Sequence, residues 1–195
     1  MRRRYYICGL LFLLITVNYL DRAVLPVAAK DVSTEFHFSP VAMGYLFSSF
    51  IWTYALFIFI AGFIVDRFST KRIQLGGCTI WSVATFFMAF VWSFPSFVGL
   101  RMVMGAAEAT SLPAAYKIVR EWMPAEERGV ATAVVSAGTY SGPAFGALLV
   151  GAVATAFGWR ASFMIAGALG LVWLILRHLV RPARARGLAQ ARGAQ

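Results

Sequence analysis

Four charged side chains lie well inside long apolar stretches of this sequence: Asp21, Arg22, Arg101 and Glu108. A charged residue at the centre of a membrane-spanning helix costs roughly 2.5 to 3.5 kcal/mol on insertion scales, so the four together oppose insertion by about 10 kcal/mol. Such residues must pair with one another or line a polar pathway. Arginine offers planar, bidentate donors that suit a carboxylate ligand. Because charges of both signs are present, the pattern favours transport of a charged solute.

The elements that hold these charges are six apolar segments, each long enough to cross a bilayer as a helix. They span residues 5–29, 41–65, 73–94, 97–119, 130–157 and 161–180. The sequence therefore predicts an all-α, polytopic membrane domain of six transmembrane helices over residues 1–180. The basic tail that follows, residues 181–195, has no apolar face. We expect it to be cytoplasmic and the start of the central loop, and either disordered or a surface strip near anionic lipid.

Two of the six segments carry all four charges at similar depth. With a rise of 1.5 Å per residue, Asp21 and Arg22 lie about 6 to 8 Å outward from the middle of the first segment. Glu108 lies near the middle of the fourth segment, and Arg101 lies about 10 Å outward from it. Arg101 and Glu108 are seven residues apart and therefore point within about 20° of each other. We expect these faces to line a common polar cavity.

The composition excludes an ordinary soluble domain, because 60% of the residues are apolar and 13% are charged, against about 25% charged in soluble domains. The formal net charge of +10 does not indicate nucleic-acid binding, since no basic and aromatic stripe stands outside the apolar segments. With six spans, most basic residues fall in loops and ends on the same side of the membrane as the N-terminus, and only Lys30 and Arg160 fall in loops on the other side. This distribution predicts a multi-pass protein of the inner or plasma membrane, in contact with lipid and with both termini cytoplasmic.

The start of the chain also resembles a signal peptide. Met-Arg-Arg-Arg precedes an apolar run, and Val27-Ala28-Ala29 offers a cleavage site of small residues. The run is longer than a usual signal-peptide core, however, and it contains Asn18 together with the charged pair that follows. We therefore interpret it as the first spanning helix.

Residues suited to enzyme or metal chemistry are few. Cys8 and Cys78 lie inside apolar segments and are interpreted as small hydrophobic residues. His37 and His178 lie outside the apolar centres, so neither a zinc site nor a Ser–His pair can be assembled within the membrane. We therefore expect no metal, no cofactor and no enzyme activity.

The loop after the second apolar segment carries a motif with many fixed positions. It reads Gly62-Phe-Ile-Val-Asp66-Arg67-Phe-Ser-Thr-Lys71-Arg72 and fits the pattern G-x-x-x-D-R-x-x-x-K/R-R throughout. In this motif the sequence resembles the major facilitator superfamily. The resemblance implies that these five residues form a conformational latch and an orientation signal rather than a substrate site.

Further motifs resemble the anion:cation symporters of that superfamily, which carry sugar acids and other organic anions. The first segment contains Asn18-Tyr19-Leu20-Asp21-Arg22. The fourth segment and its exit contain Arg101, Gly105, Glu108, Pro113, Trp122, Pro124, Glu127 and Arg128. Gly158-Trp159-Arg160, at the entry to the sixth segment, is similar to the family as well.

The resemblance implies a role for each buried polar residue. Asp21 and Glu108 match residues associated with proton coupling. The residues expected to bind the substrate are Asn18, Tyr19, Arg22, Tyr54, Arg101 and Thr139, the last at a position that is an amide in some relatives. Burial opposes the charge of a carboxylate and a neighbouring arginine favours it, so their balance decides coupling. We hypothesise that protonation of Asp21 releases a neighbouring arginine for the incoming anion, so that proton and anion move together.

Members of this superfamily have two six-helix halves, with the substrate between them near the bilayer midplane. This sequence supplies one half, built as two three-helix repeats in which the first and fourth helices correspond. Three explanations account for the missing second half: a truncation or frameshift of the chain, a separately encoded second half, or a second copy of the chain. We favour truncation, and a homodimer least, because a parallel pair would present two copies of the charged wall.

Two functions from different classes remain. The first is a proton-coupled symporter of an organic anion such as a sugar acid. The second is a non-transporting remnant, or a structural or assembly protein, in which Asp21 or Glu108 forms an ion pair that only locks two helices together. The substitutions Asp21→Asn and Glu108→Gln separate the two, since a structural protein has no transport to lose.

Overall fold

The computed structural model describes residues 2–179, and every element within that range is a helix. The order is α1 (Arg2–Glu35), α2 (Pro40–Arg67), α3 (Thr70–Phe87), η1 (Met88–Phe90), α4 (Phe94–Glu108), α5 (Ser111–Trp122), η2 (Ala125–Glu127), α6 (Arg128–Phe157) and α7 (Trp159–Leu179). The predicted tail of residues 181–195 lies outside the described residues.

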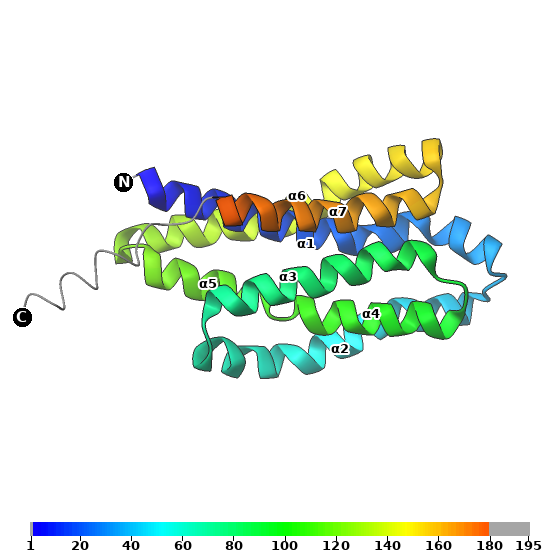
Figure 1. Ribbon diagram of the computed structural model, residues 1–195, viewed down its shortest axis with the longest axis horizontal. Coiled ribbons are helices and arrows are strands. Elements are labelled where there is room, and N and C mark those ends of the chain that lie inside the picture. The colour runs from blue at the N-terminus through cyan, green and yellow to red at the C-terminus, as the bar shows by residue number, and fades with distance from the viewer. Residues whose placement is uncertain (1, 180–195) are drawn as a thin grey trace, which may run out of the picture.

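The helices form a bundle in which consecutive spans run in opposite directions (Figure 1). The start of α1, the turn from α2 to α3, the turn from α5 to α6 and the end of α7 all lie at one end of the bundle. Five helices within the described range, namely α1, α2, α3, α6 and α7, are each long and apolar enough to cross a membrane. The remaining span consists of α4 and α5 in succession, so the six predicted segments are present.

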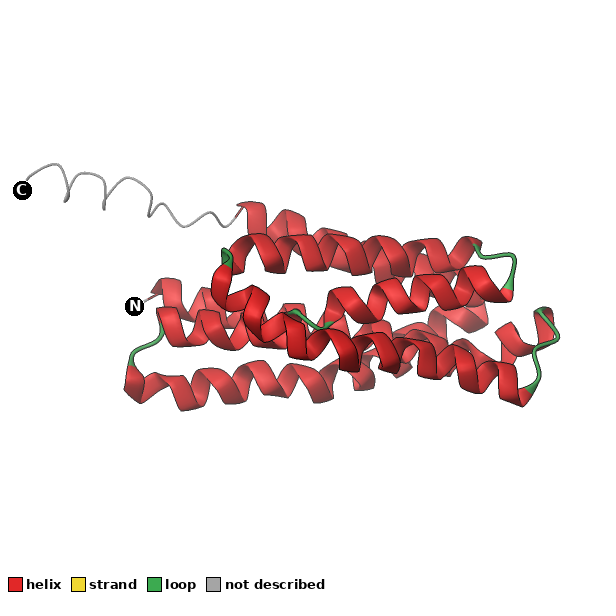
Figure 2. Cartoon of the chain, turned by 90° about the horizontal axis from the view of Figure 1, so that it is seen from below, coloured by secondary structure: helices red, strands yellow, loops and turns green. Residues whose placement is uncertain are grey.

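The fourth span differs from the prediction, which had one continuous helix over residues 97–119. The structure breaks it at Ala109 and Thr110, between a helix of 15 residues and one of 12. Figure 2 shows this break as a short loop in the middle of the bundle. The physical reason is Pro113, which lacks a backbone N–H and whose ring would clash with the carbonyl four residues earlier, that of Ala109. The break leaves Glu108 as the last residue of α4.

Helix ends also extend beyond the apolar segments. Helix α1 continues past Ala29 to Glu35, whose carboxylate accepts hydrogen bonds from the Trp159 indole at 2.8 Å and from Arg160 at 2.7 Å, which ties the end of α1 to the start of α7. Helix α4 starts at Phe94, within the segment assigned to the third span, because Ser93 and Ser96 form a capping box there. Hydropathy alone therefore predicts where each helix crosses the membrane but not the residues at which the helix begins and ends.

The helices pack in three close pairs, α1 with α6, α2 with α4, and α3 with α7. If the first, second and third spans are exchanged with the fourth, fifth and sixth, the pair α1–α6 becomes the pair α4–α2. The pair α3–α7 is unchanged by this exchange. This is the pattern expected of two three-helix repeats. Glycine makes the closest approach possible: a Cβ atom on Gly142 of α6 would lie 2.6 Å from the Thr16 carbonyl oxygen and the Tyr19 Cβ of α1.

Candidate anion and proton site

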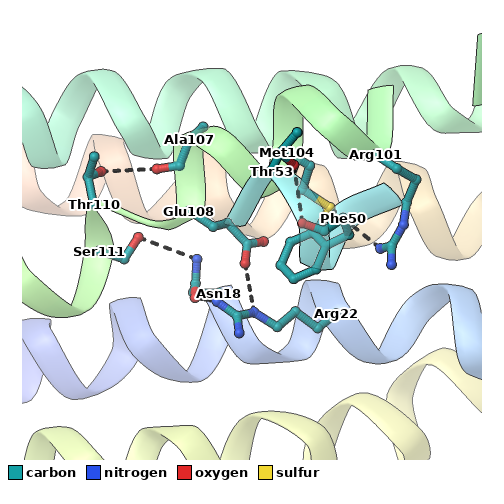
Figure 3. A network of polar contacts seen from close by, with 10 residues as sticks. All are labelled: Asn18, Arg22, Phe50, Thr53, Arg101, Met104, Ala107, Glu108, Thr110 and Ser111. Carbon is teal, nitrogen blue, oxygen red and sulfur yellow. Dashed lines mark hydrogen bonds and ion pairs between the residues drawn. The ribbon is translucent and has the colours of Figure 1, made fainter. Parts of the chain in front are cut away.

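Charged residues from α1 and α4 meet in the interior of the bundle. The Arg22 Nε donates to Glu108 Oε2 at 2.7 Å, which joins two residues that are 86 positions apart (Figure 3). The Glu108 side chain is fully buried, and that of Arg22 is 22% exposed. Because Glu108 is the last residue of α4, the break in the fourth span places its carboxylate beside α1. The structure thus brings together the two charged faces identified in the sequence.

Aromatic and amide groups surround the Arg22 guanidinium. Its Cζ lies 4.2 Å from the ring centre of Tyr19, 4.5 Å from that of Tyr54 and 5.0 Å from that of Phe50. These are cation–π distances, and each ring face attracts the positive charge. Arg22 Nη2 also donates to Asn18 Oδ1 at 3.4 Å. Of the expected substrate-binding residues, Asn18, Tyr19 and Tyr54 therefore all contact Arg22.

Arg101 is a buried cation with a different environment. The residue is 5% exposed, and within residues 2–179 no carboxylate forms an ion pair with it. Its Nη1 contacts Met104 Sδ at 4.0 Å, and its Cζ lies 4.9 Å from the ring centre of Phe50. Its Nε has no hydrogen-bond partner in the described part of the chain. A buried cation without a carboxylate partner is a favourable site for an external anion.

Asp21 is buried on the α3 side of the same region. It is 1% exposed, and neither carboxylate oxygen has a partner of hydrogen-bond geometry among the described residues, although the Trp81 indole on α3 interacts with the group. The sequence-based hypothesis gave Asp21 direct hold of an arginine. In the structure that contact belongs to Glu108, because the side chain of Arg22 reaches across to α4.

The structure does not bring Thr139 into this cluster. Its hydroxyl donates to the Ser136 carbonyl at 2.7 Å, within its own helix. Ser141, two residues further along the chain, instead contacts α1 through a 3.0 Å hydrogen bond with Thr16. The resemblance to the family therefore predicted Thr139 as a substrate-binding residue, but in this structure its hydroxyl bonds to its own helix and not to the charged cluster.

Sequence reasoning missed three residues of the cluster. Phe50 lies between the two arginines, Ser111 accepts from Asn18 Nδ2 at 3.5 Å, and Trp81 adjoins Asp21. Phe50 carried a usable signal, since it precedes Tyr54 by one helical turn and their rings stack with centres 5.6 Å apart. Ser111 carried none, because its position depends on the break in the fourth span.

A second polar cluster lies at the end of the bundle that holds the N-terminus. Lys117 Nζ on α5 donates to the Val65 carbonyl at 2.7 Å and lies 3.6 Å from Asp66 Oδ1, so it caps the last turn of α2. Arg120 lies 3.9 Å from the same carboxylate. The structure thus places Asp66 of the expected latch in an interhelical contact. The other latch residues, Gly62, Arg67, Lys71 and Arg72, are exposed.

The family model of the Major Facilitator Superfamily matches residues 11–194 of the chain. The chain belongs to the Major Facilitator Superfamily. It is similar over 94% of its length to the solved structure of a bacterial homologue of the human lysosomal transporter Spinster, in an inward-facing and occupied conformation. That match has a TM-score of 0.87 and 26% sequence identity, and it covers 45% of the solved chain.

Curated relatives of this superfamily member have names that mention sugar acids. The probable galactarate/D-glucarate transporter GarP of Escherichia coli (strain K12) is 37% identical over 185 residues, which cover 90% of this chain and 42% of GarP. The D-galactonate transporter of Escherichia coli O6:H1 is 33% identical, over 97% of this chain and 45% of that protein. The hexuronate transporter of Bacillus subtilis (strain 168) is 34% identical, over 85% of this chain and 39% of that protein.

The chain therefore spans less than half the length of the curated relatives it matches. Its six spans correspond to the N-terminal half of the Major Facilitator Superfamily fold, and it is a multi-pass membrane protein. The relatives named here are transporters rather than enzymes.

Proposed function

We propose that this chain forms the N-terminal wall of a proton-coupled symporter for an organic anion of the sugar-acid class. The observation that carries the proposal is the contrast between a half-buried arginine, Arg22, and a buried one, Arg101, in the same region. Arg22 is neutralised by Glu108, whereas Arg101 has no ion-pair partner within the described residues. The names of the relatives support a sugar acid as the anion.

The geometry supports an exchange of partners as the coupling step. Arg101 offers its donors to a carboxylate at once, while Arg22 is held by Glu108. When a proton neutralises Glu108, its attraction for Arg22 falls and the guanidinium becomes available to the anion. In this scheme one proton enters with one negative charge. Asp21 interacts by charge with Glu108 and Arg22 and serves as a second proton-accepting group of the same cluster.

A complete transport cycle needs an opposite wall, because sites of this kind lie between two halves of a transporter. We propose that a second six-helix half supplies it, whether from a longer polypeptide, from a separate chain or from a second copy. We also propose that the protein lies in the inner membrane with both ends of the described chain on the cytoplasmic side. The grouping of those ends with the Asp66, Lys117 and Arg120 cluster supports this orientation.

Binding calorimetry on the chain in lipid nanodiscs tests the coupling step without requiring transport. D-galactarate, D-glucarate and D-galactonate are titrated in two buffers that differ in ionisation enthalpy, which counts the protons taken up per anion bound. We expect at least one of these anions to bind with proton uptake. Glu108→Gln should bind the anion with fewer protons taken up, while Glu126→Gln, a control at an exposed position of η2, should behave as the unsubstituted chain. Proton uptake that is unchanged in Glu108→Gln would contradict the scheme.

A further inference from the structure

One aromatic ring lies between the two arginines of the site. The ring centre of Phe50 is 5.0 Å from Arg22 Cζ and 4.9 Å from Arg101 Cζ. Helix α2 supplies the ring, whereas α1 and α4 supply the guanidiniums (Figure 3). Because both Cζ atoms lie within 5.0 Å of the same point, they are no more than about 10 Å apart. Phe50 is therefore an uncharged group in contact with both cations, whereas the Glu108 carboxylate pairs with Arg22 and attracts Arg101 only over a longer distance.

The position of this ring is fixed by backbone packing. Helix α4 approaches α2 so closely at Gly105 that a Cβ atom there would collide with the Phe50 carbonyl oxygen. Thr53 Oγ1 donates to the same carbonyl at 3.1 Å. The ring is 6% exposed and stacks on Tyr54. Since Arg101 lies four residues before Gly105 on α4, this contact also sets the distance between the ring and Arg101.

The site must stabilise two neighbouring cations and still leave their N–H donors available to an anion, and an aromatic ring can do both. Two guanidiniums held close together repel each other, and the repulsion is stronger away from water. A carboxylate beside Arg101 would relieve the repulsion but would also compete with an incoming anion. The face of an aromatic ring attracts a cation through its quadrupole and carries no net charge, so it stabilises the guanidinium and leaves its donors free.

We propose that Phe50 is a positioning residue for anion binding, which holds the Arg22 and Arg101 guanidiniums on one ring so that a single anion meets both. This inference rests on the proposed function. It adds that Arg22 keeps its contact with Phe50, Tyr19 and Tyr54 while it exchanges Glu108 for the anion. The guanidinium then changes its partner without a large change of position.

Progressive fluorination of Phe50 tests the role of the ring face. Phenylalanine at position 50 is replaced in turn by its 4-fluoro, 3,5-difluoro and 3,4,5-trifluoro forms, which withdraw electron density from the ring face with little change in shape. We expect the Kd for D-galactarate to rise at each step, by about ten-fold over the series. The same series at Phe97 is the control, since that buried ring packs against Trp159 and Phe163. If D-galactarate binds and its Kd is constant along the Phe50 series, the proposal is wrong.

A second measurement keeps the proposal testable if no sugar acid binds, an outcome that would count against the proposed function alone. Thermal unfolding of the anion-free chain is followed along the same Phe50 series, with Arg101 present and in the Arg101→Met variant. We expect the Tm to fall along the series when Arg101 is present, and to fall less in Arg101→Met. Equal slopes in the two backgrounds would show that the ring does not hold this guanidinium, and would overturn the inference.

Discussion

The Arg22 guanidinium and the Glu108 carboxylate form their 2.7 Å ion pair at the residue where the fourth span is interrupted. The interruption at Ala109 and Thr110 separates α4, which ends at Glu108, from α5, which begins at Ser111. The Ser111 hydroxyl accepts a hydrogen bond from Asn18. Two successive side chains of α1's polar face, Asn18 and Arg22, thus contact the two sides of the break.

Removing one partner of this buried pair should cost far more than removing both. Arg22→Met leaves Glu108 buried without its cation, and we expect a loss of about 3 to 5 kcal/mol of stability. The double variant Arg22→Met/Glu108→Gln should recover most of that loss, because neither side chain then carries a charge. A double-mutant cycle on reversible unfolding in nanodiscs measures the coupling.

The exposed pair Arg4 and Glu127 provides the control for this cycle. Its atoms are 4.0 Å apart and both side chains are 46% exposed, so we expect a coupling of roughly 0 to 1 kcal/mol. A coupling at Arg22 and Glu108 as small as that of the control pair would contradict the expected stabilisation of the buried Glu108 carboxylate by Arg22.

Arg101 should show the opposite balance between stability and binding. Because this cation is buried without an ion-pair partner in the described chain, Arg101→Met removes a charge that the fold does not neutralise. We expect the Tm to be unchanged or higher, and the affinity for D-galactarate to fall by more than about ten-fold. The exposed Arg67→Met variant should change neither quantity. A fall in Tm comparable to that of Arg22→Met would mean that Arg101 has a structural partner.

Two glycines of α6 should respond differently to the same substitution. A Cβ atom at Gly142 would overlap α1 at Thr16 and Tyr19, whereas Gly151 has open space around its Cα. Gly142→Ala should therefore destabilise the bundle by about 1 to 3 kcal/mol, while Gly151→Ala should be neutral or stabilising because alanine favours a helix. Thermal unfolding of the two variants compares them directly. Equal Tm values would show that the close contact of α1 and α6 is not needed.

The sequence was sufficient to predict the six spans and to assign the four charges to two of them, because spans follow from hydropathy and from the length of a helix. It could not predict which carboxylate holds Arg22. That choice depends on how far each helix is rotated about its own axis, and the rotation is set by packing between distant segments, as at Gly105 and Gly142. The spacing of Phe50 one helical turn before Tyr54 places both rings on one face of α2, but only the contact of α2 with α4 brings the Phe50 ring close to both arginines.

The glycine contacts have a mechanical consequence. Gly142 joins α6 to α1, Gly105 joins α4 to α2, and Gly167 joins α7 to α3, in each case with backbone close to backbone. Helices in such contact cannot slide or roll past each other without a steric clash, so the three pairs resist shear within the bundle. A bundle of this kind moves as one rigid body, so in the proposed transporter the movement that alternates access takes place between this bundle and the second half.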